Sequence, residues 1–175
     1  QHGGVYRGGA AQRWGEEYTF RIDKAPANLD PALTCGPEMA RVRALMYWNM
    51  DKTARSEWAN LVTSKTKDQQ AQLARYAFNQ NWWDLSVQAT IAGKLWDQLE
   101  ERFPLAYNDI LTRYISGKDI PQSYAMAIVR QESAWNPKAG SPVGARGLMQ
   151  MMPGTATHMG KMVKIPGYSG TLQML

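Results

Sequence analysis

Apolar side chains recur at helical spacing through the middle of the chain. Pro37 suits a first helical position, and Val42, Leu45 and Met46 follow it in three- and four-residue steps. Similar steps predict four more helices. The first of these has Asp51 or Thr53 as its cap and carries Trp58, Leu61 and Val62. The second is capped by Asp68 and carries Leu73, Tyr76 and Ala77. The third follows Trp82 and carries Leu85, Ala89, Ala92 and Trp96, and the fourth spans residues 105–115. No strand is predicted, so the expected fold class is all-α.

A weak internal match supports a repeat among these helices. Residue types recur at a shift of 30 positions in the pairs Ala44/Ala74, Asn49/Asn79, Ser56/Ser86 and Ala59/Ala89, and Trp48 falls on Phe78. Paired helices at such a period predict a short α-solenoid. The tryptophans before residue 100 are then expected to be wedges between helices. Sugar stacking, above all by Trp82 and Trp83, is the alternative.

Composition shifts divide the chain into three parts. Residues 1–36 are rich in Gly, Pro and Ala and form an irregular lead-in, residues 37–117 form the superhelical region, and residues 118–175 form a new unit. Ser116, Gly117 and Lys118 close the helical array, because glycine is common just past a helix end. The chain begins with Gln1 and His2, so either a targeting segment has been removed or this is a piece of a longer protein.

Bulk composition narrows the classes of function. Hydrophobic residues make up 44% of the 175 and charged residues 20%, an ordinary globular balance. No stretch reaches the roughly 18 apolar residues that a membrane span needs. The single cysteine, Cys35, excludes an internal disulfide framework and a multi-cysteine metal site, and we expect an inert thiol and no cofactor or metal. The net charge of +5 favours anionic partners, but no helix carries the dense basic stripe of a nucleic-acid reader.

One predicted helix carries a candidate acid. It begins at Pro121 with Asp119 as its cap and ends near Ala134, before Asn136 and Pro137. Tyr124, Ile128, Glu132 and Trp135 follow helical spacing and predict a carboxylate on an apolar stripe in the last turn. Burial and the negative helix end would both raise the pKa of Glu132, as a general acid requires. The alternative is an exposed glutamate at a fraying helix end.

No Asp or Glu follows Glu132 as far as Leu175. A standard glycosidase uses two carboxylates, roughly 5–5.5 Å apart when retaining and roughly 6.5–9.5 Å apart when inverting. A second carboxylate would have to come from Asp119, from the superhelical region or from residues beyond Leu175. If the substrate is a sugar, a mechanism with one carboxylate is therefore favoured.

The segment after Glu132 has the composition of a ligand-binding loop or of a Met-rich core. Gly144 and Gly147 permit positive φ or close approach by a ligand, and Pro153 can start another helix. Met149, Met151 and Met152 are soft, groove-filling side chains.

Together, these residues resemble the soluble lytic transglycosylases, a family related to goose-type lysozyme. Its first motif matches Glu132-Ser133, and its second matches Gly147-Leu148-Met149-Gln150 with Pro153-Gly154-Thr155-Ala156. Segments 36–41, 54–61 and 83–88 are similar to the large ring-shaped members of Gram-negative bacteria. The resemblance covers about residues 15–175 and implies a superhelical linker followed by the first part of a lysozyme-like α domain. The family's third motif, Ala-Tyr-Asn-Ala-Gly, does not occur here, so a truncated catalytic domain is expected.

The resemblance implies a periplasmic enzyme that binds and cuts peptidoglycan glycan strands at the β-1,4 bond after N-acetylmuramic acid. Glu132 would protonate the glycosidic oxygen and then take the proton of the muramic O6 hydroxyl, which gives a 1,6-anhydro end. Ser141 and Gln150 would hydrogen-bond the sugar or the acid, Met149 and Met152 would line the groove, and Ser133, Gly147, Leu148, Pro153 and Gly154 would build the motifs. The alternatives are a lysozyme-type hydrolase that uses the same glutamate and a non-catalytic helical scaffold that binds cell wall or a partner.

Overall fold

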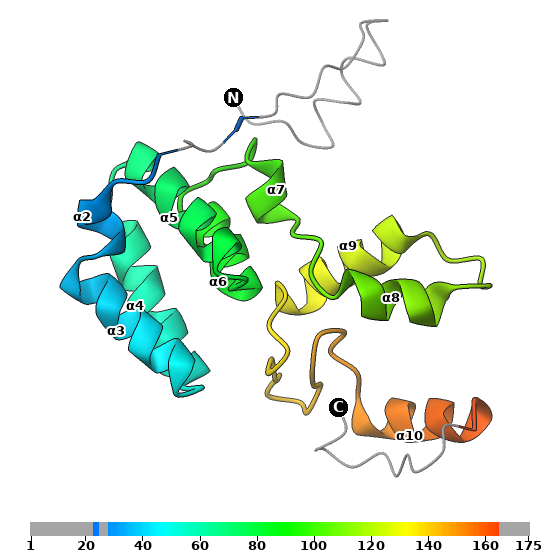
Figure 1. Cartoon of the computed structure of the whole chain (residues 1–175). Helices are drawn as coiled ribbons and strands as arrows, with labels where there is room; N and C mark the ends of the chain where they lie inside the picture. Colours follow the sequence, from blue (N-terminus) through cyan, green and yellow to red (C-terminus); the bar gives the residue numbers. More distant parts are fainter. Residues whose placement is uncertain (1–22, 25–27, 165–175) are drawn as a thin grey trace, which may run out of the picture. The chain divides into compact units, whose positions relative to one another are not determined.

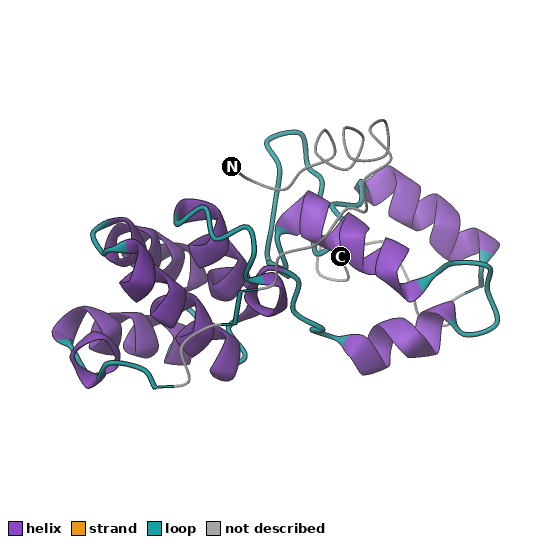
Figure 2. Ribbon diagram, turned by 90° about the horizontal axis from the view of Figure 1, so that it is seen from above, coloured by secondary structure: helices purple, strands orange, loops and turns teal. Residues whose placement is uncertain are grey.

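The computed structural model describes residues 23–24 and 28–164, and the predicted lead-in lies mostly outside them. Within the described residues every regular element is a helix (Figures 1 and 2), which confirms the all-α prediction. The helices are α2 (Pro31–Thr34), α3 (Pro37–Tyr47), α4 (Asp51–Thr63), α5 (Lys67–Asn79), α6 (Trp83–Ala92), α7 (Leu99–Arg102), α8 (Asn108–Ile115), α9 (Gln122–Ser133) and α10 (Pro153–Met162). None of the described helices has the length and apolar character to cross a membrane.

The chain forms two compact units, which divide between Pro104 and Leu105. The sequence placed this boundary after Gly117 instead. The structure assigns α8 to the second unit because α8 packs against α9, and Gln122 Nε2 donates a hydrogen bond to Asn108 Oδ1.

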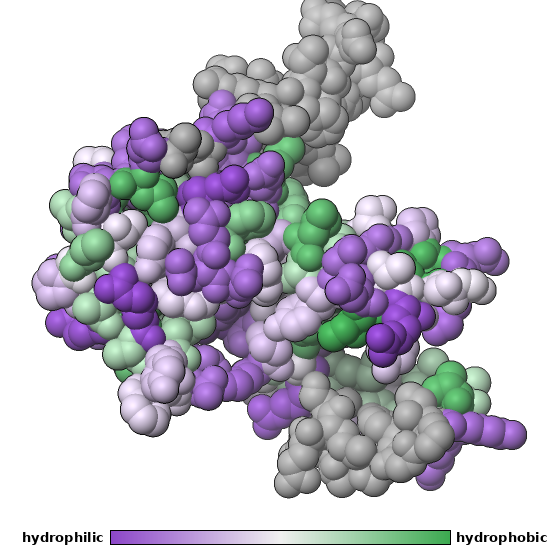
Figure 3. Space-filling model, in the orientation of Figure 1, coloured by the Kyte–Doolittle hydropathy of each residue, from purple (hydrophilic) through white to green (hydrophobic). Residues whose placement is uncertain are grey.

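The first unit buries one apolar core between two helical hairpins, α3–α4 and α5–α6. Its buried members include Met39, Val42, Trp58, Leu73 and Leu85, each with no exposed surface. Trp58 also donates from Nε1 to the carbonyl of Leu85 at 2.8 Å, so one side chain ties α4 to α6. In the face shown in Figure 3, hydrophobic side chains are scattered over this unit among hydrophilic ones.

Three helix ends of this unit use the same turn. Helices α3, α5 and α6 are each followed by a left-handed residue, namely Asn49 (φ 55°), Asn81 (φ 59°) and Lys94 (φ 51°). The next N–H then reaches the carbonyl five residues back, at 2.8 Å for Met50 to Leu45, 2.9 Å for Trp82 to Ala77 and 2.8 Å for Leu95 to Thr90. This bond defines the Schellman end, which satisfies carbonyls that a helix terminus leaves open.

The turns correct the register of the repeat. From Asn49 to Asn81 the shift is 32 positions, and at this shift buried Val42 falls on buried Ala74 and buried Ala54 on buried Ser86. The predicted shift of 30 is wrong as a register of packing, because it sets exposed Ala44 on buried Ala74 and exposed Ser56 on buried Ser86. Helix α5 is two residues longer than α3, so the two helices start 30 positions apart while the turns that end them lie 32 positions apart.

Several predicted caps are also corrected. Asp51 is the first residue of α4 and Met50 is its N-cap. Helix α5 is capped by Thr66, whose hydroxyl accepts from the Gln69 N–H at 3.3 Å while Gln69 Oε1 accepts from the Thr66 N–H at 3.1 Å. This reciprocal capping box outcompetes Asp68, the predicted cap. Trp96 lies beyond the end of α6 and stacks under the Arg102 guanidinium instead.

Candidate active site

Helix α9 places Glu132 in its last turn, as the sequence predicts. The helix ends at Ser133, and Ala134 (φ 49°) and Trp135 (φ 67°) then take left-handed backbone conformations. Its N-terminus differs from the prediction, because Pro121 is the N-cap and no side chain, Asp119 included, caps it. The positive φ values turn the chain sharply before Pro137.

The predicted buried stripe of α9 is wrong by one position. Tyr124 is 62% exposed and Glu132 is exposed, whereas the buried positions are Ala125, Val129 and Ser133. Trp135 is buried, but it lies past the helix, where its ring stacks on Tyr107 with centroids 6.3 Å apart. The buried residues of α9 are smaller than Tyr124, which lies on the exposed side of the helix.

The Glu132 carboxylate is therefore open to a ligand. Among the described residues, no hydrogen bond or ion pair engages it, in contrast to Glu101 of the first unit, which bonds Arg75. The predicted burial of Glu132 by its own helix is not found. Its neighbour Ser133 is buried, and Ser133 Oγ donates to the Val129 carbonyl at 3.1 Å, so Ser133 fixes the helix end and not the carboxylate.

A tight loop follows, joined by two isolated antiparallel bridges. Arg146 pairs with Met151 through two backbone hydrogen bonds of 3.0 and 2.9 Å, and Arg146 also bridges Gly140. The buried Gly147 has φ 76°, and its N–H donates to the Ala139 carbonyl at 2.9 Å. A side chain at Gly147 would strain this left-handed position, which accounts for the glycine.

The polar residues that the sequence selected hold this loop. Gln150 Nε2 donates to the carbonyls of Ala139 (3.0 Å) and Gly147 (2.9 Å), and Ser141 Oγ accepts from the Ala145 N–H at 2.9 Å. Gln150 is half-buried and has a left-handed backbone, φ 47°. Both side chains thus fix backbone geometry, and the Gln150 Oε1 atom takes part in neither hydrogen bond.

The methionines of the loop are surface residues. Met149 is 41% exposed, Met151 36% and Met152 42%, so the alternative of a Met-rich core is wrong for the described residues. Leu148 is half-buried, Pro153 opens α10, and a Cβ on Gly154 would meet no atom within 4 Å.

The structure also reveals two acids, the buried Glu101 and the half-buried Asp84, that the sequence analysis did not select. Burial raises the pKa of Glu101 above 4.5, although Arg75 opposes this, and burial likewise raises the pKa of Asp84 above 3.8 against the effect of Arg55. Both lie in the first unit. No group of three or more potential metal ligands occurs among the described residues.

The fold defines the class of protein. A solenoid-like helical unit precedes a second all-α unit. Residues 33–99 match the family model of the soluble lytic murein transglycosylase L domain, and residues 109–173 match that of the transglycosylase SLT domain. The chain belongs to the soluble lytic murein transglycosylase family.

Relatives and solved structures agree with this assignment. The soluble lytic murein transglycosylase of Escherichia coli strain K12 is 76% identical over all 175 residues, which cover 27% of that protein. The 70-kDa soluble lytic transglycosylase in complex with bulgecin A matches with a TM-score of 0.91 and 75% identity, over 100% of this chain and 28% of that one. An inactive Glu-to-Gln mutant of the Pseudomonas aeruginosa enzyme Slt matches with a TM-score of 0.81 and 30% identity, over 95% of this chain and 27% of that one. The chain thus spans about a quarter of the length of these relatives.

Proposed function

We propose that this chain contributes the catalytic acid and part of the glycan-binding groove of a lytic transglycosylase that cleaves murein. The observation that carries the proposal is the exposed Glu132 carboxylate in the last turn of α9, which no hydrogen bond or ion pair engages among the described residues, in a member of this family. No Asp or Glu follows Glu132 in the sequence, so the segment from Glu132 to Leu175 supplies one carboxylate.

One carboxyl can carry the reaction if it acts twice. Glu132 donates its proton to the glycosidic oxygen between N-acetylmuramic acid and N-acetylglucosamine, and the C1–O bond breaks. The 2-acetamido group of the muramic unit stabilises the positive charge at C1. The Glu132 carboxylate then accepts the proton of the O6 hydroxyl, O6 bonds to C1, and a 1,6-anhydro end forms without water.

A bound glycan strand would exclude water from Glu132, which α9 itself leaves exposed. A glycan lying on Glu132 displaces water from the carboxyl, and the loss of water favours the neutral acid. The loop holds its shape through Ser141 and the amide nitrogen of Gln150, and we assign the Gln150 Oε1 atom, which neither of those two hydrogen bonds uses, to a hydrogen bond with the sugar. Met149 and Met152, both partly exposed, line the same groove.

The loss of activity in the Pseudomonas aeruginosa Glu-to-Gln mutant supports a mechanism that depends on one glutamate. Murein lies in the periplasm of Gram-negative bacteria, and we place the parent protein there.

The test uses a chimera, because relatives are about four times as long as this chain. The matching segment of the Escherichia coli relative is replaced by these 175 residues, and sacculi are digested in H2(18)O and studied by mass spectrometry. We expect anhydro ends without 18O, and Glu132→Gln should lower their rate by about 10²–10⁴-fold. Asp119→Asn, which removes another carboxylate of the second unit, is the matched control and should leave the rate unchanged.

Each other outcome has a definite meaning. Reducing ends that carry 18O would identify a hydrolase of the lysozyme type. Undiminished anhydro products from Glu132→Gln would show that this residue is not the acid, and retained cell-wall binding without any cleavage would favour the scaffold.

A further inference from the structure

The first unit carries a groove lined largely by aromatic side chains, far along the chain from Glu132. This aromatic groove has a volume of about 660 Å³ and is lined by Arg43, Ala44, Met46, Tyr47, Trp48 and Trp82. Pockets for small ligands have volumes of roughly 300–1,000 Å³ and mainly apolar walls, so the groove has room for one or two sugar rings.

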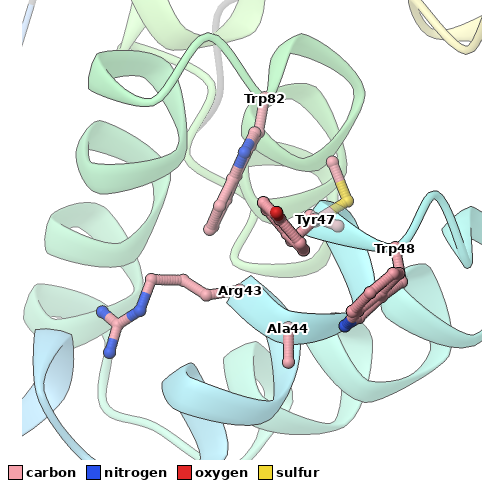
Figure 4. A pocket seen from close by; sticks show the side chains of 6 residues that line it. Arg43, Ala44, Tyr47, Trp48 and Trp82 are labelled. Atoms are coloured by element: carbon pink, nitrogen blue, oxygen red, sulfur yellow. The ribbon is translucent and has the colours of Figure 1, made fainter.

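Two of the aromatic rings in the groove, those of Tyr47 and Trp48, are exposed to solvent and contact each other. Tyr47 is 77% exposed and Trp48 is 71% exposed, and their rings meet edge to face with centroids 5.2 Å apart and planes at 90°. Figure 4 shows Tyr47 and Trp82 facing each other, with Trp48 just past the end of α3. The backbone under these rings is fixed by the Schellman turn at Asn49.

The repeat itself does not require aromatic residues here. The equivalent turn after α5 has the same backbone, but its surface positions are Asn79 and Gln80, both polar and exposed. Trp58, by contrast, has no exposed surface and serves the packing between helices. Exposed large aromatic side chains that fold stability does not need indicate a binding surface. The prediction that every tryptophan before residue 100 is a wedge therefore fails for Trp48.

The groove wall is largely uncharged. Among the described residues that line it, Arg43 is the one charged residue, and no carboxylate is among them. Arg43 Nη1 donates to the Thr34 carbonyl at 2.7 Å and to Tyr76 Oη at 3.0 Å. These bonds fix the guanidinium, while the aliphatic part of the Arg43 side chain lines the groove. Murein glycans carry carboxylates on their muramic units or stem peptides.

We propose that the aromatic groove is a second murein-binding site, in which a sugar ring of the glycan strand stacks on Trp48 and Tyr47. Its apolar wall at Ala44 and Met46 suits the methyl of an N-acetyl group. The choice of murein as the glycan rests on the proposed function above. The site would hold a strand on the first unit while the second unit acts on its own segment.

The experiment measures binding of the full 175-residue chain to sacculi freed of protein by detergent and protease. All samples carry Glu132→Gln so that the strand stays intact. Trp48→Ala should weaken co-sedimentation with sacculi by about tenfold, because a stacking aromatic is the side chain whose loss costs most. Trp48→Phe keeps a ring and should restore most of the binding. Ile91→Ala removes an exposed apolar side chain outside the groove and should change nothing.

A second readout identifies the atoms involved. On titration with chitotetraose, a neutral N-acetylglucosamine oligomer, the indole N–H resonance of Trp48 should shift while that of buried Trp58 stays in place. Amidase-stripped murein strands, which keep the lactyl carboxylate, should bind more tightly than chitotetraose.

The proposal would be overturned if the Trp48→Ala chain bound sacculi as well as the chain that keeps Trp48. It would also be overturned if the Trp48 indole N–H resonance did not shift on titration with chitotetraose. So would failure of protein-free sacculi to bind, since that would point to a protein occupant. If the proposed catalytic function fails, Glu132→Gln leaves cleavage intact while the effect of Trp48→Ala on binding persists, so the two proposals fail separately.

Discussion

The two units of the chain use their apolar residues in opposite ways. The first unit buries large side chains such as Trp58, Leu73 and Leu85. The second unit buries mostly small ones, such as Ala125 and Ala156, and helix α8 has no buried residue among those described, although its apolar and polar faces are sharply separated. Large apolar side chains of the second unit are instead exposed, among them Ile110, Tyr114, Tyr124, Met149 and Met152.

This contrast separates stability from chemistry. The first unit is held by its own core, whereas the loop that follows α9 is held by backbone hydrogen bonds and by Gln150. Substitutions in the first unit should therefore act on the free energy of unfolding. Substitutions in the second should act on the shape of the site.

The strongest test of the contrast is Trp58→Ala. The ring has no exposed surface and its Nε1 donates to the Leu85 carbonyl, so truncation leaves a cavity and removes the hydrogen bond that ties α4 to α6. We expect a loss of about 3–5 kcal/mol of unfolding free energy, measured by urea denaturation. Trp48→Ala, at an exposed position, should stay within about 0.5 kcal/mol.

A comparison of the two buried tryptophans sharpens this result. Trp135 Nε1 is buried and has no hydrogen-bond partner among the described residues, unlike Trp58 Nε1. Trp58→Phe should therefore cost roughly 1 kcal/mol more than Trp135→Phe. Equal costs would mean that packing alone, and not the bond to Leu85, decides the value.

The next largest effect concerns the buried ion pair of the first unit. Arg75 Nη1 contacts Glu101 Oε1 at 3.1 Å, and the Glu101 side chain is 2% exposed. Arg75→Met would leave that carboxylate without its cation and should cost about 3 kcal/mol. Arg41 and Glu57, at 3.4 Å and largely exposed, form the control pair, and Arg41→Met should cost about 0–1 kcal/mol.

The same acid predicts how stability depends on pH. Because burial raises the pKa of Glu101 above 4.5, the folded chain retains a proton that the unfolded chain has released. The unfolding free energy should therefore fall as pH rises from 4.5 through the raised pKa, and Asp84 acts in the same direction from 3.8.

Denaturation at a series of pH values checks this sign. Glu101→Gln cannot titrate and should flatten the fall, while Glu57→Gln at the exposed pair should leave it unchanged. A slope of the opposite sign in the parent chain would show that Arg75 outweighs burial.

The sequence predicted the helices well because proline and helical periodicity mark them directly. Helix α3 begins at Pro37 and α10 at Pro153, as expected. The short α7 was missed, since one helical turn has no periodicity to detect. The inward face of α9 was also missed, because hydrophobicity favours Tyr124 and Ile128 over Ala125 and Ser133, and only close packing selects the small residues.

The sequence identified which residues form the candidate site but not the hydrogen bonds and exposure of their side chains. Glu132 lies at a helix end as expected, yet its exposure depends on where α9 meets its neighbours, which no local pattern encodes. Likewise, the sequence selected Gln150 but could not show that its amide would bond two carbonyls of its own loop.

The smallest effects come from two glycines of the second unit. Gly147 is buried with φ 76°, so Gly147→Ala forces a side chain into left-handed backbone and should cost about 1–2 kcal/mol. Hydrogen exchange of the Gly147 N–H, which donates to Ala139, would report the loosened loop directly.

Gly154 contrasts with Gly147, because the described residues give no steric reason for a glycine at position 154. A Cβ there would meet no atom within 4 Å, and the residue lies in the first turn of α10, where alanine is favoured by up to about 1 kcal/mol. Gly154→Ala should therefore leave the second unit as stable as before, or slightly more so. If the chimera that carries it nevertheless forms anhydro ends more slowly, the glycine is needed by the strand and not by the fold, and a bound sugar must pass close to the start of α10. If its activity is unchanged, the groove does not reach Gly154, and the binding surface ends at the loop that carries Met149 and Gln150.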